Sequence, residues 1–133
     1  MIKGRCECGA VSYEVDAEIT DFSHCHCSQC RRLHGAAFAS FGGVSRDKFQ
    51  YLSGQSSLKI YASSDAIDRV SCSVCSSQIL VDNKPEPDVL YIAMGAVDGS
   101  PDCPTGYHQF VGSKAPWYEI NDGLAQHETW PES

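Results

Sequence analysis

The sequence predicts a mostly β protein with a single domain of short antiparallel strands, and three observations support this class. Apolar residues alternate with polar ones in short segments such as Val11–Val15 and Leu58–Tyr61, which is typical of half-buried strands. Clusters of Gly, Pro, Asn and Asp separate these segments, as expected of turns. A length of 133 residues suits one compact domain and leaves little room for a second. We expect this domain to span residues 1–133, with a core of about 2–118 and a tail of 119–133.

The remaining elements follow from the same patterns, in chain order. Further strands are predicted at Ala36–Phe41, Phe49–Leu52, Ile67–Val70, Ile79–Val81 and Val89–Met94. The continuous apolar run of the last of these indicates a strand buried on both faces. Helix is scarce: one short helix is predicted over Ser28–His34, ended by Gly35, and another helical turn near Ser45–Lys48. The tail that begins at Trp117 carries two tryptophans, which favours packing back over the domain.

Composition and charge narrow the choice of partners and compartment. The formal net charge is −7, and the ten Lys and Arg residues are scattered, so a nucleic-acid groove is disfavoured. The N-terminal residues lack an apolar run of signal-peptide length, and no segment approaches the length of a membrane span. We therefore expect a cytoplasmic protein with neither a nucleic acid nor a membrane as its partner.

The cysteines carry the strongest chemical signal in the chain. Seven of the eight fall into three tight groups: Cys6 and Cys8, then Cys25, Cys27 and Cys30, then Cys72 and Cys75. In a reducing compartment such a set indicates metal binding or catalysis rather than disulfides. A two-residue gap in a tight turn brings two thiolates to one zinc ion, and a one-residue gap in an extended segment places both on one face. Each group can therefore act as a unit of ligands.

Seven thiolates divide most naturally into a site of four and a site of three. The pairs Cys6/Cys8 and Cys72/Cys75 would join distant segments around a closed, structural zinc ion. The triplet Cys25, Cys27 and Cys30 would hold a second zinc ion with a fourth position open to substrate, which is the pattern of a catalytic site. We expect two zinc ions per chain.

Other interpretations of the cysteines stay open at this point. They could be small apolar core residues, or the ligands of an iron–sulfur cluster. The triplet could also be closed by a fourth protein ligand and be purely structural, with the candidates His24, His26, His34 and His108. Cys103 stands alone in a proline-rich loop, and we interpret it as an incidental thiol rather than a metal ligand.

Several segments together resemble the glutathione-dependent formaldehyde-activating enzyme family, which shares its domain with centromere protein V. The matching segments are Gly4-Arg5-Cys6-Glu7-Cys8-Gly9-Ala10-Val11, His24-Cys25-His26-Cys27-Ser28-Gln29-Cys30-Arg31-Arg32, His34-Gly35-Ala36, the Cys72/Cys75 pair and Ser113-Lys114-Ala115-Pro116-Trp117. The resemblance covers nearly the whole chain. It implies a β-rich, tent-like fold, a structural zinc on the two cysteine pairs and a catalytic zinc on the triplet.

The resemblance also implies carbon–sulfur lyase activity, in which glutathione and formaldehyde join to form S-(hydroxymethyl)glutathione, or the reaction runs in reverse. Two positions depart from the family pattern, because Ser71 and Ser76 stand where many members carry an aromatic residue and a glycine. If the backbone after Cys75 needs a positive φ, serine adopts it at some cost.

The predicted substrate is a small thiol, with glutathione as the first candidate. Arg31, Arg32 and Lys114 could receive its two carboxylates and Trp117 could cover the peptide, although each could equally be a solvated surface charge or, for Trp117, a core residue. No spacing argument selects a general acid or base. The competing hypothesis is a non-enzymatic zinc module that binds a protein partner, and the fourth ligand of the triplet would separate the two. The sequence leaves the oligomeric state open.

Overall fold

The computed structural model describes residues 1–131, and in this part of the chain strands dominate, as predicted. The strands are β1 Ile2–Arg5, β2 Ser12–Val15, β3 Asp21–Cys25, β4 Ala39–Ser45, β5 Phe49–Ser53, β6 Leu58–Ala62, β7 Ile67–Cys72, β8 Gln78–Asn83, β9 Val89–Ala93, β10 Tyr107–Gln109 and β11 Ala125–Gln126. The helices are α1 Ser28–His34 and the short 3-10 helices η1 Arg46–Lys48, η2 Gln55–Ser57, η3 Met94–Ala96 and η4 Val111–Ser113.

The strands form two sheets. A three-stranded sheet has the order β1-β2-β5, and an eight-stranded sheet has the order β11-β10-β3-β4-β9-β8-β7-β6. The pairing is antiparallel as predicted except at one edge, where β10 runs parallel to β3 and β11 runs parallel to β10. The mostly β fold class is therefore confirmed, with a mixed rather than a purely antiparallel long sheet.

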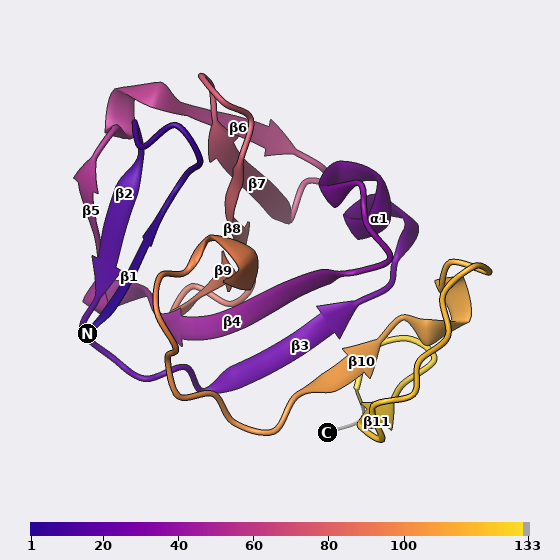
Figure 1. Ribbon diagram of the computed structural model, residues 1–133. Helices are drawn as coiled ribbons and strands as arrows, with labels where there is room; N and C mark the ends of the chain where they lie inside the picture. The colour runs from indigo at the N-terminus through magenta and orange to yellow at the C-terminus, as the bar shows by residue number, and fades with distance from the viewer. Residues whose placement is uncertain (132–133) are drawn as a thin grey trace.

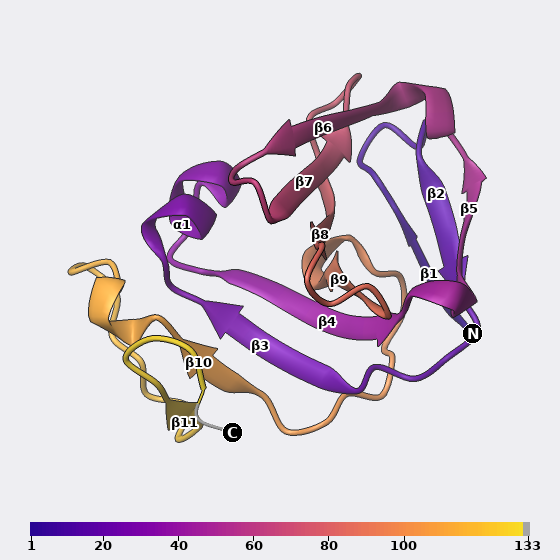
Figure 2. The same ribbon diagram turned by 180° about the vertical axis from the view of Figure 1, so that it is seen from behind.

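The long sheet curls on itself and the short sheet covers its open side. In Figure 1 it passes from β3 and β4 at the bottom, through β9 and β8, to β7 and β6 at the top, with the short sheet on the left. Helix α1 lies at the opposite side, between the ends of β3 and β4 and the β6–β7 layer, and the reverse view agrees (Figure 2). Residues from β3, α1 and β7 therefore meet at one end of the molecule.

The main core lies between the two sheets, and strand alternation fills it. In β2, Tyr13 and Val15 are buried while Ser12 and Glu14 are only half-buried, as the period-two pattern predicts. Tyr13 packs so closely on β1 that a Cβ at Gly4 would lie 2.4 Å from its ring, so only glycine fits there. A smaller core cluster surrounds Cys25 and Cys30 at the other end of the long sheet.

The predicted helix matches α1, and two other elements are shifted. Gly35 adopts a left-handed conformation with φ 58°, which ends the helix where predicted. The strand expected at Ala36–Phe41 starts later, at Ala39, because the chain first has to turn back after the helix. The helical turn expected near Ser45–Lys48 is the 3-10 helix η1.

Strand β9 differs from its predicted environment. The apolar run predicts burial on both faces, but Val89 and Tyr91 are only half-buried, while Leu90 and Ile92 are buried. The Tyr91 ring instead borders a cavity, described below, and its hydroxyl bonds Glu86. One face of β9 therefore belongs to a site rather than to the core.

The tail packs back on the domain, as expected from its tryptophans. Strand β11 pairs with β10, and the carbonyl of Thr129 accepts a hydrogen bond from the amide of Phe110 at 3.0 Å. The rings of Phe110 and Trp130 meet edge to face with centroids 4.8 Å apart. The last two residues of the predicted tail, 132 and 133, lie outside the described residues.

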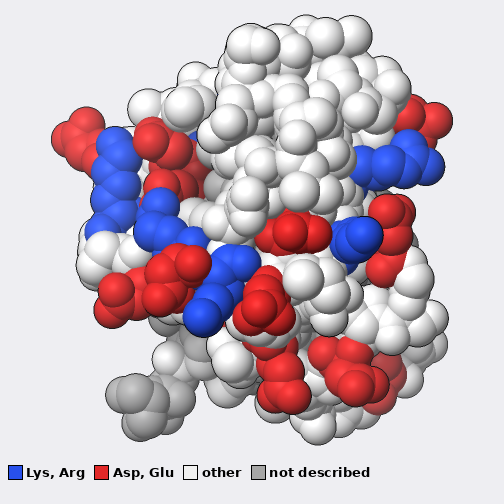
Figure 3. All heavy atoms as spheres, turned by 90° about the vertical axis from the view of Figure 1, so that its left-hand side faces the viewer, with Lys and Arg blue, Asp and Glu red and all other residues white. Residues whose placement is uncertain are grey.

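The surface and helices bear on possible partners. On the face shown in Figure 3, acidic and basic side chains are interspersed, so the described residues of this face form no continuous positive surface. Among the described helices, none combines the length and the apolar run that a bilayer crossing needs.

Candidate metal centres and the adjoining cavity

The first cysteine cluster joins the two sheets. Cys6 and Cys8 follow β1, Cys72 ends β7, and Cys75 lies in the turn between β7 and β8. The four Sγ atoms are all within 4.8 Å of one another. The Sγ atoms of Cys6 and Cys8 are 3.6 Å apart, and those of Cys8 and Cys72 are 3.9 Å apart. Tetrahedral coordination with zinc–sulfur bonds of about 2.3 Å separates sulfurs by about 3.8 Å, so this donor set fits a zinc-sized ion.

Backbone turns rather than extended segments present these thiols. The expected extended geometry of Cys6 and Cys8 is wrong, because the chain turns there and the Gly9 amide donates to the Cys6 carbonyl at 3.2 Å. The amide of Val11 donates to the Cys6 Sγ at 3.2 Å, and that of Val74 to the Cys72 Sγ at 3.4 Å. Such N–H donors stabilise thiolate sulfur and orient it toward a metal.

The turn after Cys75 carries the predicted backbone strain. Ser76 has φ 69°, in the left-handed region that favours glycine. Its amide closes the turn by donating to the Cys72 carbonyl at 2.9 Å. The backbone after Cys75 therefore has the positive φ considered from the sequence, and Ser76 holds a conformation that a glycine would adopt more easily.

The second cluster forms where β3 runs into α1. The Sγ atoms of Cys25, Cys27 and Cys30 lie within 4.8 Å of one another, with Cys25 and Cys30 buried and Cys27 half-buried. Cys27 is the N-cap of α1, and its Sγ accepts a hydrogen bond from the Cys30 amide at 3.3 Å. The N-cap thus places the sulfurs of Cys27 and Cys30 at the first turn of α1, beside the sulfur of Cys25, which ends β3.

Arg69 of β7 completes the surroundings of this second cluster. It is only 6% exposed, and its Nη1 donates to the Cys30 Sγ at 3.2 Å. The same guanidinium donates to the Gln29 Oε1 at 3.4 Å and to the Ser63 Oγ at 3.2 Å. A buried arginine needs such partners, and its charge offsets that of the thiolates. Sequence reasoning missed Arg69, since nothing local distinguishes it from an ordinary strand residue.

The four histidines considered as a fourth ligand have other positions. Within the described chain, none of them joins the group of three sulfurs. His24 Nδ1 lies 2.7 Å from the Ser40 Oγ, and His26 Nε2 lies 2.7 Å from His108 Nδ1. His108 Nε2 in turn lies 2.8 Å from the Asp122 Oδ2, and burial together with the charges of neighbouring groups lowers the pKa of His26 to about 4. These contacts hold the β3–β10 layer together.

The thiols of the triplet share protons unequally. Hydrogen bonds from Cys25 and Cys30 lower the pKa of Cys27, and the nearby Arg69 charge acts in the same direction. The same bond to Cys27 raises the pKa of Cys25. Hydrogen bonding among the sulfurs and the Arg69 charge thus favour a thiolate within the triplet, which is a favourable starting point for binding a cation.

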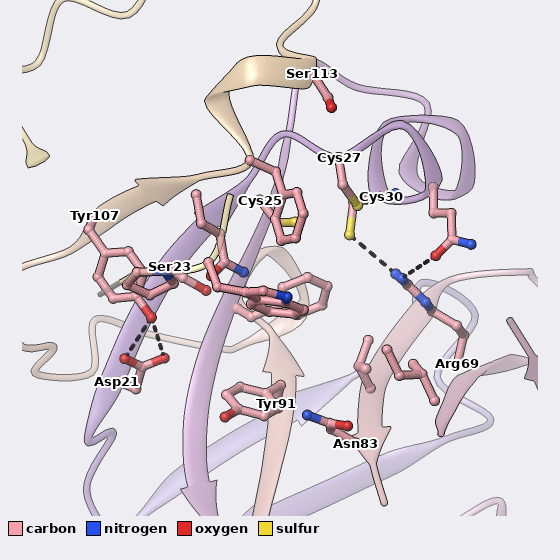
Figure 4. A pocket seen from close by; sticks show the side chains of 18 of the residues that line it. Asp21, Ser23, Cys25, Cys27, Cys30, Arg69, Asn83, Tyr91, Tyr107 and Ser113 are labelled. Carbon is pink, nitrogen blue, oxygen red and sulfur yellow. Dashed lines mark hydrogen bonds between the residues drawn. The ribbon is translucent and has the colours of Figure 1, made fainter. Parts of the chain in front are cut away.

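A cavity of about 510 Å³ opens directly beside the triplet. Its lining comes from β3, α1, β4, β7, β8, the β8–β9 loop, β9, β10, η4 and the tail. The lining residues are Asp21, Ser23, Cys25, Cys27, Ser28, Gln29, Cys30, Phe41, Ile67, Arg69, Val81, Asn83, Glu86, Tyr91, Tyr107, Gln109, Phe110, Ser113, Trp130 and Pro131. Figure 4 shows the cysteines at the top, Arg69 at the right, the Asp21–Tyr107 pair at the left, and Tyr91 and Asn83 at the bottom. A small molecule of a few tens of atoms fits this volume.

The residues predicted to bind glutathione lie elsewhere. Arg31, Lys114 and Trp117 are outside the set of described residues that line this cavity. Lys114 donates to the carbonyls of Ala115 and Tyr118, and Trp117 is 71% exposed. Arg31 is half-buried on α1, and Arg32 is exposed on the same helix. No contact between these residues and the cavity supports their predicted role in binding glutathione.

Fold and clusters together define a class: a small, mostly β protein with two cysteine clusters that could each hold a metal ion, one of them beside a cavity. All seven clustered cysteines fall within residues 1–113, which match the family model of the glutathione-dependent formaldehyde-activating enzyme. The chain belongs to this family.

Individual relatives agree with this assignment. A Halomonas elongata protein, named provisionally as a glutathione-dependent formaldehyde-activating enzyme, is 28% identical over 127 residues, which cover 90% of this chain and 81% of that protein. The crystal structure of a Rhodobacter sphaeroides protein is similar with a TM-score of 0.65 and 20% identity, over 94% of this chain and 98% of that one. At this identity the structural likeness shows the fold alone.

Proposed function

We propose that this protein is a zinc-dependent carbon–sulfur lyase that forms or cleaves an adduct between a small thiol and an aldehyde. The observation that carries the proposal is the position of the triplet, whose three sulfurs line a cavity of about 510 Å³. A four-cysteine cluster elsewhere in the fold leaves the triplet free for chemistry. The family name supplies glutathione and formaldehyde as the first candidates for thiol and aldehyde.

The chemistry divides between the ion and the chain. Zinc bound at the triplet would supply positive charge that favours the thiolate form of a substrate thiol at neutral pH. Cys25, Cys27 and Cys30 would hold the ion, and Arg69 would offset the negative charge that these sulfurs bring. In the synthetic direction the substrate thiol gives its proton to water and its sulfur bonds to the aldehyde carbon. The carbonyl π electrons move to oxygen, and that oxygen takes a proton from water, so that no net proton is gained or lost. The reverse direction returns thiol and aldehyde.

The glutathione version of this proposal assigns its carboxylates to basic groups. Arg31 and Lys114 remain the candidates from the sequence, with Trp117 as a cover for the peptide. Both cations act on the same buried group, since their charges are among the influences that lower the pKa of His26. They would reach a substrate only if it extended beyond the cavity lining.

The test combines metal analysis with an exchange measurement. Purified protein should contain close to two zinc ions per chain and should accelerate the exchange between glutathione and formaldehyde, followed by proton NMR. Cys27→Ser is the matched inactive variant, and Cys103→Ser is the control because Cys103 is exposed and outside both clusters. Two zinc ions with exchange no faster than in buffer would reject this function.

A second candidate function is a zinc module that binds a protein partner through its sheet. The observation that favours it is the edge strand β6, where Ile60 and Tyr61 are 62% and 53% exposed. If β6 docks a partner, Ile60→Lys should abolish binding of that partner. The module proposal expects no acceleration of thiol exchange in either protein, whereas the lyase proposal expects the same acceleration in both.

A further inference from the structure

The end of the cavity remote from the cysteines is lined by two carboxylates. Asp21, Ser23 and Cys25 all line the cavity, as expected for alternate residues of β3 that share one face. Asp21 stands four positions before Cys25, which corresponds to about 13 Å along a strand. Glu86 lines the cavity too. A ligand with its sulfur at the triplet would therefore direct its other end toward these acids.

Tyrosine hydroxyls and an amide hold both carboxylates in place. The Tyr107 hydroxyl donates to both oxygens of Asp21, at 3.0 and 3.1 Å. The Tyr91 hydroxyl donates to the Glu86 Oε2 at 2.5 Å, and the Asn83 Nδ2 donates to its Oε1 at 2.8 Å. An ionised carboxylate accepts about four hydrogen bonds, so each acid keeps lone pairs for a ligand. In Figure 4 the Asp21–Tyr107 pair lies at the left and Tyr91 and Asn83 lie at the bottom, all away from the cysteines.

Asp21 and Glu86 both affect the pKa values of Tyr91 and Tyr107. Burial raises the pKa of Tyr91, followed by its bond to Glu86 and by the charges of Glu86 and Asp21. Burial, the bond to Asp21 and the Asp21 charge raise the pKa of Tyr107, and the Glu86 charge adds to this. Each tyrosine thus senses both carboxylates. Negative charge is concentrated at one end of the cavity, and aromatic faces lie beside it.

The basic side chain that lines the cavity, Arg69, is already hydrogen-bonded to other residues of the protein. Among the described residues of the lining, Arg69 is the one lysine or arginine, and its guanidinium bonds Cys30, Gln29 and Ser63. A substrate carboxylate at the far end would meet Asp21 and Glu86 without a cation to pair with. A substrate ammonium would find two charged acceptors and the rings of Tyr91 and Tyr107, which also attract cations.

We propose that the thiol substrate carries a primary ammonium group, and that Asp21 and Glu86 bind this group while the sulfur lies at the triplet. The proposal rests on the proposed function and names the substrate class of the same site. Subtracting sulfur–sulfur and hydrogen-bond distances from the strand length leaves on the order of 7 Å between the substrate's sulfur and nitrogen. An aminothiol with a flexible spacer of about six atoms has this reach.

The experiment compares thiols of equal length that differ at one end. Aminohexanethiol, mercaptohexanol and mercaptohexanoic acid are titrated into the zinc-loaded protein, and their binding is followed by calorimetry under reducing conditions. The expected order of affinity is amine, alcohol, acid, with about tenfold between the first two, which is typical of a hydrogen bond to a charged group. In Asp21→Asn and Glu86→Gln the preference for the amine should fall severalfold. Asp65→Asn removes an exposed carboxylate outside the lining and should leave it unchanged.

The outcomes separate the two proposals. Binding of all three thiols with equal affinity would overturn the ammonium proposal and leave the lyase proposal standing, since a thiol would still enter the site. A preference for the amine that persists in both acid variants would also overturn it. If no thiol binds, both proposals fail. A preference lost in the two variants and kept in Asp65→Asn supports the ammonium site whether or not formaldehyde is the aldehyde.

Discussion

The two cysteine clusters use similar ligands but join very different parts of the chain. In the first, Cys8 and Cys72 are 64 positions apart, and the thiols connect the short sheet with the β7–β8 turn of the long sheet. The second draws all its sulfurs from residues 25–30, where β3 continues into α1. An ion at the first cluster would hold distant segments together, whereas one at the second would close a small loop of a layer that β4 and β10 already hold. On this comparison we propose a structural role for the first cluster and a chemical role for the second.

The surroundings of the clusters differ in the same direction. Backbone amides of Val11 and Val74 support the sulfurs of the first cluster, and Ser77 lies 3.2 Å from the Cys75 Sγ. The second cluster has the Arg69 guanidinium and an adjoining cavity. Neutral donors with four thiolates suit a permanent ion. A buried cation beside three thiolates suits a site where the charge changes as ligands come and go.

The largest expected effect comes from Cys72→Ser. This change removes a ligand from the first cluster, and structural zinc contributes on the order of 10 kcal/mol to folding, comparable with the whole stability of a small domain. The variant should unfold or aggregate, as measured by circular dichroism and thermal melting in reductant. A folded variant with a normal melting curve would show that the first cluster is not structural.

Cys27→Ser should have a different effect, on metal content and activity more than on folding. The triplet loses one of its three sulfurs, while the pairing of β3 with β4 and β10 remains. We expect a folded protein with close to one zinc ion and little exchange activity. Elemental analysis and circular dichroism of the same preparation check this. Unfolding as complete as that of Cys72→Ser would remove the distinction between the clusters.

Arg69→Lys tests whether the guanidinium matters to the second cluster alone. Lysine keeps the charge but cannot bond Cys30, Gln29 and Ser63 in the same way, and a hydrogen bond to a charged group is worth about 2 kcal/mol. A chelator should remove the ion of the second cluster faster from this variant than from the original protein, and the ion of the first cluster at an unchanged rate. A metal-sensitive dye follows the release of both ions. Equal changes for both ions would mean that Arg69 acts through the fold.

Ser76→Gly should produce the smallest effect, a modest gain in stability at the first cluster. Glycine adopts the observed φ of 69° without the left-handed penalty of about 1 kcal/mol, which corresponds to roughly 4 °C in melting temperature. Gly9→Ala is the mirror control, since Gly9 has φ 82° in the Cys6–Cys8 turn and open space around its Cα. It should lower the melting temperature by a similar amount. A decrease for Ser76→Gly would contradict the strain argument.

Much of this comparison was predictable because it rests on local spacing. Ser28–His34 and Gly35 form the predicted helix and stop, since cap and αL geometry depend on a few neighbouring residues. The grouping of the thiols into four and three follows from counting, and the structure brings each group together. The extended geometry expected of Cys6 and Cys8 is wrong, because these residues lie in the short turn between β1 and β2.

What the sequence did not indicate depends on strand order. Arg69 reaches the triplet only because the long sheet curls and brings β7 opposite α1, and no periodicity encodes that approach. The pairing of Asp21 with Tyr107 spans 86 positions and needs the parallel alignment of β10 with β3. Strand β10 itself has three residues, too few for a pattern. Conversely, Arg31 and Lys114 followed from proximity in sequence and lie away from the cavity lining within the described chain.

The most direct test of the central claim asks whether an external thiol reaches one cluster and not the other. Cobalt-substituted protein is titrated with glutathione and with aminohexanethiol up to millimolar concentration while the visible absorption is recorded. The account predicts a saturable change in the original protein and no change in Cys27→Ser, whose remaining cobalt lies in the four-cysteine cluster. A spectrum that stays constant in the original protein at millimolar thiol would show that both clusters are closed and would contradict the account.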